Sequence, residues 1–242
     1  MKIKLLFFAL IVFSVSLNAG KTTKIVILHT NDTHSQVEPL GSNDMGGYAR
    51  RMGVINQIRS EEKTVLLLDA GDFLQGTPYF NFYGGRVEGT ALKMMGYDAV
   101  TLGNHEFDNG IDSLVNVLKT AKIDVVNTNF DFSNTPLQPL VQPYKIIKRG
   151  GVKIGVFGLG VNLNGLAFQK NFAGLILKEP IASALQTSDY LKKTLKCDLV
   201  ICLSHLGVSS LDSTPTDYDL AAASTNIDVI IGGHSHKMLV NE

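Results

Sequence analysis

The chain carries the stretch Leu-Gly-Asn-His-Glu-Phe-Asp-Asn-Gly at residues 102–110, which places an amide, an imidazole and carboxylates within one short turn. An apolar run at residues 98–102 leads into it and predicts a buried strand. Polar side chains directly after a buried strand indicate either a solvated loop or a site that uses them. The rest of the chain decides between these two interpretations.

Four further polar clusters follow short apolar runs in the same way. They are Asp32-Thr-His34, Gly71-Asp72, Ser204-His205 and Gly233-His-Ser-His236. Side chains at the carboxyl ends of strands in an open α/β sheet converge on one crevice. The five clusters together therefore predict a single site.

Length and composition indicate a single domain with a large core, since the chain has 242 residues and is 45% apolar. Basic and acidic residues balance at 22 each. A chain without excess positive charge is not expected to bind nucleic acid through electrostatic attraction.

The N-terminus has the pattern of a signal peptide. Lys2 and Lys4 precede an apolar and small run at residues 5–17, and small residues follow at 18–20. A spanning helix needs roughly 20 apolar residues, which this run does not provide. We predict a signal peptide at 1–19, one domain at 20–242, and export to the periplasm or cell surface without stable membrane insertion. A retained signal anchor is the alternative.

The two cysteines, Cys197 and Cys202, flank an apolar run at residues 199–203 that predicts a strand. On one extended segment their Cα atoms would lie about 16 Å apart at ~3.3 Å per residue. A disulfide requires a Cα separation below about 7 Å, so both thiols are expected to stay free.

Predicted strands alternate with predicted helices along most of the chain. Strands are expected at 24–29, 64–69, 98–102, 125–129, 199–203 and 228–231, with a hairpin at 144–148 and 152–158; helices are expected at 46–62, 90–95, 111–121, 181–196 and 217–224. Residues 75–89 are rich in aromatics and are expected to pack as a loop, a base-stacking platform being the alternative. Gly155, Gly158 and Gly160 lack the spacing of a dinucleotide-binding motif.

In order, the five clusters resemble the motifs of the calcineurin-like metallophosphoesterases. The motif sequences at residues 28–34, 46–51 and 103–108 are similar to those of the 5'-nucleotidase branch, and the resemblance covers almost the whole mature chain. It implies an α/β fold, a four-layer α/β/β/α sandwich of two mixed sheets with a dinuclear metal site at strand ends.

The donors are oxygen and nitrogen atoms suited to Zn, Mn or Fe, and they outnumber the four ligands of one zinc site. This surplus indicates two divalent metal ions. The resemblance implies that Asp32, His34 and His236 hold one ion and that Asn104, His205 and His234 hold the other, with Asp72 bridging both. His234 and His236 are expected on an extended segment, facing the same way.

The resemblance also implies a mechanism in which a hydroxide bridging the two ions attacks phosphorus. His105 is then the catalytic side chain that stabilises the transition state or protonates the leaving group, and Asp108 orients it. Glu106 and Asn31 are expected to support the ligands or the loop, and His29 is expected to be a strand-end residue. The implied reaction hydrolyses nucleoside 5'-monophosphates to nucleoside and phosphate. Alternatives are a 2',3'-cyclic nucleotide phosphodiesterase and a nucleotide-sugar hydrolase.

Members of the branch continue past the last motif into a C-terminal domain that binds the base, whereas only residues 237–242 follow His236. We therefore expect the nucleotide-binding domain to be absent from this chain and a separate substrate-binding protein to be a possible partner. The rival hypothesis is a metal-binding module that becomes active only with such a partner and that presents an exposed sheet edge to it.

Overall fold

The computed structural model describes residues 22–41, 45–209 and 214–239. The predicted signal peptide at 1–19 lies outside these residues. Within the described ranges, every helix is too short or too polar to cross a membrane.

A five-stranded sheet forms the first half of the molecule, in the order β1-β2-β3-β4-β6. All of its described strand pairs are parallel. The strands are β1 (Val26–Thr30), β2 (Val65–Asp69), β3 (Ala99–Val100), β4 (Val125–Val126) and β6 (Val141–Gln142), connected through α1 (Tyr48–Glu61), α2 (Pro78–Tyr83), α3 (Arg86–Met95) and α4 (Ile111–Ala121). The sequence of β2 is apolar up to its last residue because both faces of the strand are buried.

A four-stranded mixed sheet forms the second half, in the order β11-β10-β8-β7. β7 (Tyr144–Arg149) and β8 (Val152–Leu159) form an antiparallel hairpin through Gly150 and Gly151, both with positive φ, as a two-residue hairpin turn requires. β8, β10 (Leu199–Ser204) and β11 (Val229–Gly232) are parallel. The helices of this half are α5 (Pro180–Asp189), continued by a π-helical turn at Tyr190–Thr194, and α6 (Asp217–Ala223); a small antiparallel pair joins β5 (Phe130–Asp131) to β9 (Ile176–Leu177).

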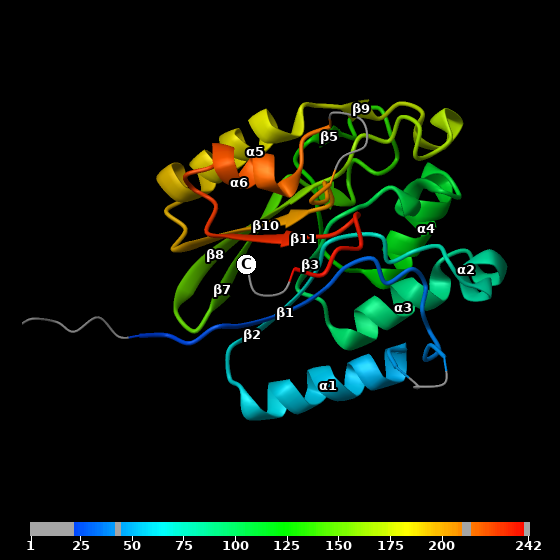
Figure 1. The fold of residues 1–242 in the computed structure, drawn as a ribbon, viewed down its shortest axis with the longest axis horizontal. Coiled ribbons are helices and arrows are strands. Elements are labelled where there is room, and N and C mark those ends of the chain that lie inside the picture. The colour runs from blue at the N-terminus through cyan, green and yellow to red at the C-terminus, as the bar shows by residue number, and fades with distance from the viewer. Residues whose placement is uncertain (1–21, 42–44, 210–213, 240–242) are drawn as a thin grey trace, which may run out of the picture.

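Three apolar clusters show how these parts stack. Between the sheets, Leu66 and Leu68 of β2 pack with Val156 of β8 and Ile201 of β10. A second cluster joins the outer face of the first sheet to α1, α3 and α4, and a third joins the outer face of the second sheet to α5 and α6. Helices therefore cover both outer faces (Figure 1), which confirms the predicted four-layer α/β/β/α sandwich.

The structure corrects four details of the sequence-based predictions. Only one of the two sheets is mixed among the described strands, since the first is parallel. Residues 75–89 are largely helical, because Pro78 starts α2 and left-handed Gly84 ends it before α3. The helix predicted at 181–196 widens to a π-turn after Asp189. The 98–102 and 125–129 strands are shorter than predicted. Both cysteines are free, as predicted, and both are buried.

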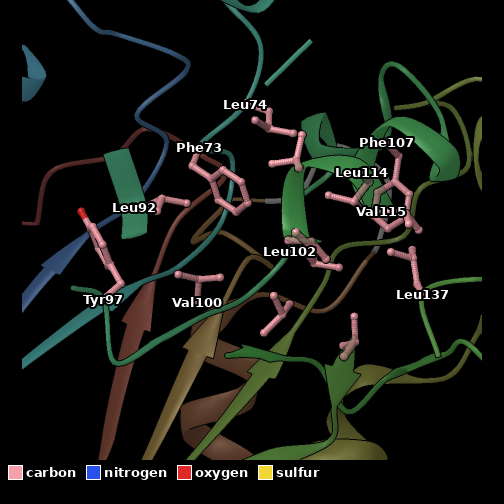
Figure 2. Packing of buried hydrophobic residues seen from close by; sticks show 14 of the residues in the cluster. Phe73, Leu74, Leu92, Tyr97, Val100, Leu102, Phe107, Leu114, Val115 and Leu137 are labelled. Carbon is pink, nitrogen blue, oxygen red and sulfur yellow. The ribbon is translucent and has the colours of Figure 1, made fainter. Parts of the chain in front are cut away.

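The loops that follow β2 and β3 are anchored in the core. Phe73 and Leu74 come directly after Asp72, and Phe107 comes two residues after His105; all three side chains are at most 2% exposed. Figure 2 shows them packed in one cluster with Leu102 and Leu114. Apolar anchors on either side of the polar residues fix where these loops lie.

Candidate metal centre

Both sheets contribute polar loops to one end of the sandwich. Asp32 and His34 follow β1, Asp72 follows β2, and Asn104 follows β3, while His205 follows β10 and His234 and His236 follow β11. The donor atoms of these loops lie close together, as three overlapping groups show: Asp32 with His34 and His236; His34 with Asp72 and His105; and Asp72 with His205 and His234. The sequence-predicted clusters therefore meet at one place.

The backbone of these loops is in an unusual conformation. Asp32, His34, Asp72, His234 and His236 all have positive φ, between 43° and 69°. A left-handed backbone is uncommon for residues other than glycine and persists only where surrounding contacts hold it. The expectation of an extended segment at His234 and His236 is wrong, because left-handed turns, rather than strand alternation, aim these two rings.

The group around Asp32 joins the first loop to the last. Nε2 of His34 lies 3.0 Å from Nε2 of His236, and Nε2 of His236 lies 3.6 Å from Oδ1 of Asp32. The backbone N–H of His234 also donates to Oδ1 of Asp32 at 2.8 Å. Two imidazole nitrogens facing each other need a cation or a proton between them, since two lone pairs repel.

The group around Asp72 is more deeply buried. Nε2 of His205 lies 3.0 Å from Oδ2 of Asp72, and Nδ1 of His205 lies 2.7 Å from the carbonyl oxygen of Ala70. That carbonyl can only accept, so Nδ1 carries the proton and Nε2 is the ring nitrogen that faces Asp72. His205 is fully buried and Asp72 is 2% exposed.

Asn104 lies between Gly103 and His105, both of which approach this second group. A Cβ added at the preceding Gly103 would sit 2.3 Å from Oδ1 of Asp72 and 2.5 Å from Nε2 of His205, so only glycine allows the loop to come this close. Oδ1 of Asn104 is buried and has no hydrogen-bond partner among the described residues. A buried amide oxygen without a donor suits a bound cation.

The charges of the site are strongly coupled. Burial opposes ionisation of both partners, but the neighbouring imidazole lowers the pKa of Asp72 to about 2, and the carboxylates of Asp72 and Asp32 raise the pKa of His205 to about 9. Burial lowers the pKa of His34 and of His234. The opposite charges of Asp72 and His205 therefore stabilise each other.

His105 is positioned by an acid from its own turn. Its Nδ1 lies 2.7 Å from Oδ2 of Asp108, and this hydrogen bond raises the pKa of His105. Its backbone N–H donates to Oδ1 of Asp72 at 2.9 Å. The His105 and Asp108 side chains, about 30% and 26% exposed, also line a cavity of about 740 Å³ formed with residues 164–169 and Phe172.

Two residues next to the predicted ligands have contacts that the sequence did not specify. The carboxylate of Glu106 accepts three backbone N–H groups, and the side-chain amide of Asn31 donates to Oδ2 of Asp32 at 2.5 Å. The feature of the sequence that pointed to a role for Glu106 was the position of its carboxylate within a motif that follows a buried strand. Two of its three partners lie more than 30 residues away, which no local pattern reveals.

The donors fit divalent cations. Carboxylate, amide and imidazole groups are the usual ligands of Zn, Mn and Fe, and the orphaned oxygen of Asn104 and the facing nitrogens of His34 and His236 are groups that a cation would satisfy. The ligands of cations bound there would be Asp32, His34, Asp72, Asn104, His205, His234 and His236.

Comparison with known proteins adds an independent line of support. Residues 25–238 match the family model described as calcineurin-like phosphoesterase. The chain is 34% identical to 5'-nucleotidase of Rattus norvegicus over 234 residues, which is 91% of this chain and 39% of that protein. It thus spans about two fifths of the length of the curated relatives it matches.

Solved structures agree with this assignment. The crystal structure of a 5'-nucleotidase precursor from Thermus thermophilus superposes with a TM-score of 0.80 at 35% identity, covering 90% of this chain and 43% of that one. NAD nucleotidase of Haemophilus influenzae superposes with a TM-score of 0.76 at 29% identity, covering 90% of this chain and 39% of that one. The family-model match over most of the chain, together with the fold, shows that the chain belongs to the calcineurin-like phosphoesterase family, and 5'-nucleotidases are among its relatives.

Proposed function

We propose that this protein is a metal-dependent phosphohydrolase that converts nucleoside 5'-monophosphates to nucleoside and phosphate. The observation that carries the proposal is the convergence of carboxylate and imidazole donors from both sheets on one cluster, with Asp72 and His205 buried at its centre. In this proposal Asp32, His34 and His236 would hold one divalent ion, Asn104, His205 and His234 would hold a second, and Asp72 would be a ligand of both.

Bound divalent ions would supply an activated water and neutralise the phosphoryl oxygens. The chain's own contribution is then a proton for the departing oxygen. His105 is suited to this role because Asp108 favours its protonated form and fixes the orientation of its ring. The cavity beside this pair gives the leaving group room next to the proton that it needs.

Similarity to the 5'-nucleotidases supports nucleotides as the substrate class. The structural likeness to a NAD nucleotidase favours a second candidate, the hydrolysis of larger nucleotides on the same cluster. A substrate-binding domain or partner belongs to the proposal as well, since more than half of the Rattus norvegicus 5'-nucleotidase and of the Thermus thermophilus chain lies outside the region similar to this chain.

Export to the periplasm or cell surface is also proposed. It rests on the pattern at residues 1–20, in which basic residues are followed by apolar residues and then by small residues. The Thermus thermophilus relative is described as a precursor.

The test is phosphate release from AMP by residues 20–242 in the presence of Mn²⁺. Asp72→Asn is the control, because the amide keeps an oxygen for the His105 N–H but loses the charge that would contact both ions. Release that disappears in the control supports the proposal. A folded, metal-loaded chain that releases no phosphate from AMP refutes activity of this chain alone on nucleotides.

His105→Asn separates catalysis from metal binding. We expect it to lower the rate about 10²- to 10⁴-fold, the usual contribution of a positioned acid, with metal content unchanged. Loss of metal in parallel with rate would instead make His105 a ligand, which its proximity to His34 and Asp72 allows.

A further inference from the structure

Glu106 is a buried carboxylate in the middle of the ligand-bearing loops. It lies in the 3₁₀ turn His105–Phe107, and the residue is 2% exposed. A buried acid is costly unless its oxygens are satisfied, so its contacts indicate what it does.

Three backbone N–H groups converge on its two oxygens. Oε2 accepts from Asp72 at 2.9 Å and from Gly103 at 2.6 Å, and Oε1 accepts from Leu74 at 3.1 Å. Asp72 and Leu74 belong to the loop after β2, whereas Gly103 belongs to the loop after β3. A single carboxylate therefore ties together two loops that each carry a proposed ligand.

The tie is reciprocal. Glu106 accepts the N–H of Asp72, while Oδ1 of Asp72 accepts the N–H of His105 at 2.9 Å. Asp72 has a φ of +56°, a backbone conformation that residues other than glycine rarely adopt. The hydrogen bond to Glu106 thus helps to hold the backbone of Asp72, the proposed bridging ligand, in this strained conformation.

The loop after β1, which carries Asp32 and His34, is held in turn by the loop after β2. The N–H groups of Asp32, His34 and Ser35 donate to the carbonyl oxygens of Gly71, Asp72 and Phe73 at 2.9, 3.0 and 3.1 Å. Any shift of the loop after β2 would carry Asp32 and His34 with it. The side chains of Leu74 and Phe107, next to the same residues, are packed in the core (Figure 2), so apolar contacts hold these loops in addition to Glu106.

We propose that Glu106 is a positioning residue that sets the spacing of the proposed metal ligands Asp72, Asn104, Asp32 and His34 by joining the loops after β2 and β3. This inference rests on the proposed metal cluster. It needs a carboxylate: glutamine offers one acceptor oxygen and an NH₂ group that would face an N–H donor, so Glu106→Gln cannot keep all three hydrogen bonds.

The experiment measures Mn²⁺ affinity by calorimetric titration of residues 20–242, at a temperature where each variant is folded by circular dichroism. Glu106→Gln is expected to weaken binding about 10- to 100-fold, the usual effect of losing a group that orients metal ligands. Glu106→Asp keeps the charge but is one methylene shorter, and it is expected to weaken binding similarly because it cannot reach both loops. It also carries the test if Glu106→Gln does not fold.

Asp98→Asn is the matched control. Asp98 also accepts a backbone N–H from the β2 region, that of Leu67 at 2.9 Å, and it pairs with Arg149, but it precedes β3 whereas the ligand loops follow the strands. The same acid-to-amide change there should lower stability and leave Mn²⁺ affinity within about 2-fold.

Two outcomes would overturn the inference: Glu106 variants that lose stability but bind Mn²⁺ as the wild type does, or an aspartate variant with wild-type affinity, which would assign the effect to charge alone. A wild-type chain that binds no Mn²⁺ would instead refute the metal cluster of the proposed function.

Discussion

At the scale of single residues, Asp69 shows how a buried acid couples stability to pH. Asp69 ends β2 and is fully buried; its Oδ1 accepts the N–H of Gly71 at 2.9 Å, and its Oδ2 is bonded by the hydroxyl of Thr30. Burial raises its pKa from 3.8 to about 7, although these hydrogen bonds oppose the shift. Its folded state therefore binds a proton more tightly than its unfolded state.

Asp69 therefore makes the folded state less stable as pH rises. Between about pH 4 and pH 7 the folded state holds more protons on Asp69 than the unfolded state, so this group lowers the free energy of unfolding as pH rises, by up to about 1.4 kcal/mol per pH unit. Asp69→Asn cannot titrate and keeps an oxygen for Gly71. Urea denaturation in EDTA at pH 5, 6 and 7 should show the variant gaining stability relative to wild type as pH rises. A difference between the two chains that is the same at all three values would contradict this assignment.

At the scale of elements, β8 approaches the first sheet so closely that one position requires glycine. A Cβ added at Gly158 would lie 2.2 Å from Oγ1 of Thr101 and 2.2 Å from the carbonyl oxygen of Val126. The backbone oxygen cannot move away without shifting β4. Glycine here is a packing requirement between the two sheets rather than a turn.

We expect Gly158→Ala to lower the free energy of unfolding by about 1–3 kcal/mol, the typical effect of overpacking. Gly53→Ala is the matched control, since Gly53 is exposed inside α1 and has no neighbour within 4 Å of an added Cβ. Alanine there should raise stability by about 0.5–1 kcal/mol through helix propensity. Chemical denaturation of both variants provides the comparison, and equal effects of the two substitutions would show that the sheets are not in the close contact described.

At the scale of the whole molecule, the proposed ligands come from both sheets, so a bound ion would cross-link the two halves. Asp32 and His236 lie at opposite ends of the described chain yet belong to one group of donors. Mn²⁺ at about 100 times its dissociation constant should stabilise the folded state by about 2.7 kcal/mol. For a chain of this size that corresponds to about 2–4 °C in Tm for each kcal/mol.

Thermal denaturation with Mn²⁺ and with EDTA measures this effect, and Asp72→Asn should lose most of the difference. A wild-type Tm that is the same in Mn²⁺ and in EDTA would argue against a site shared by the two sheets. Stabilisation that persists unchanged in Asp72→Asn would place the bound ion elsewhere in the protein.

The sequence by itself determined the alternation of strands and helices, the free cysteines and the polar clusters that follow five of the strands. These features could be predicted because they depend on local periodicity and on the types of side chain that precede and follow each strand. The resemblance to the phosphoesterases also followed from the order of the clusters, which is a property of the chain.

The tertiary structure alone decided how the clusters meet. Local patterns did not predict the left-handed turns that aim His234 and His236, the contact of His34 with a ring 202 residues away, or the three hydrogen bonds of Glu106. The helices within residues 75–89, a segment expected to be a loop, were not predicted; Pro78 and Gly84 mark where α2 begins and ends. Each of these features depends on which loops the packed sheets bring together, and contacts between distant residues form only when the chain folds.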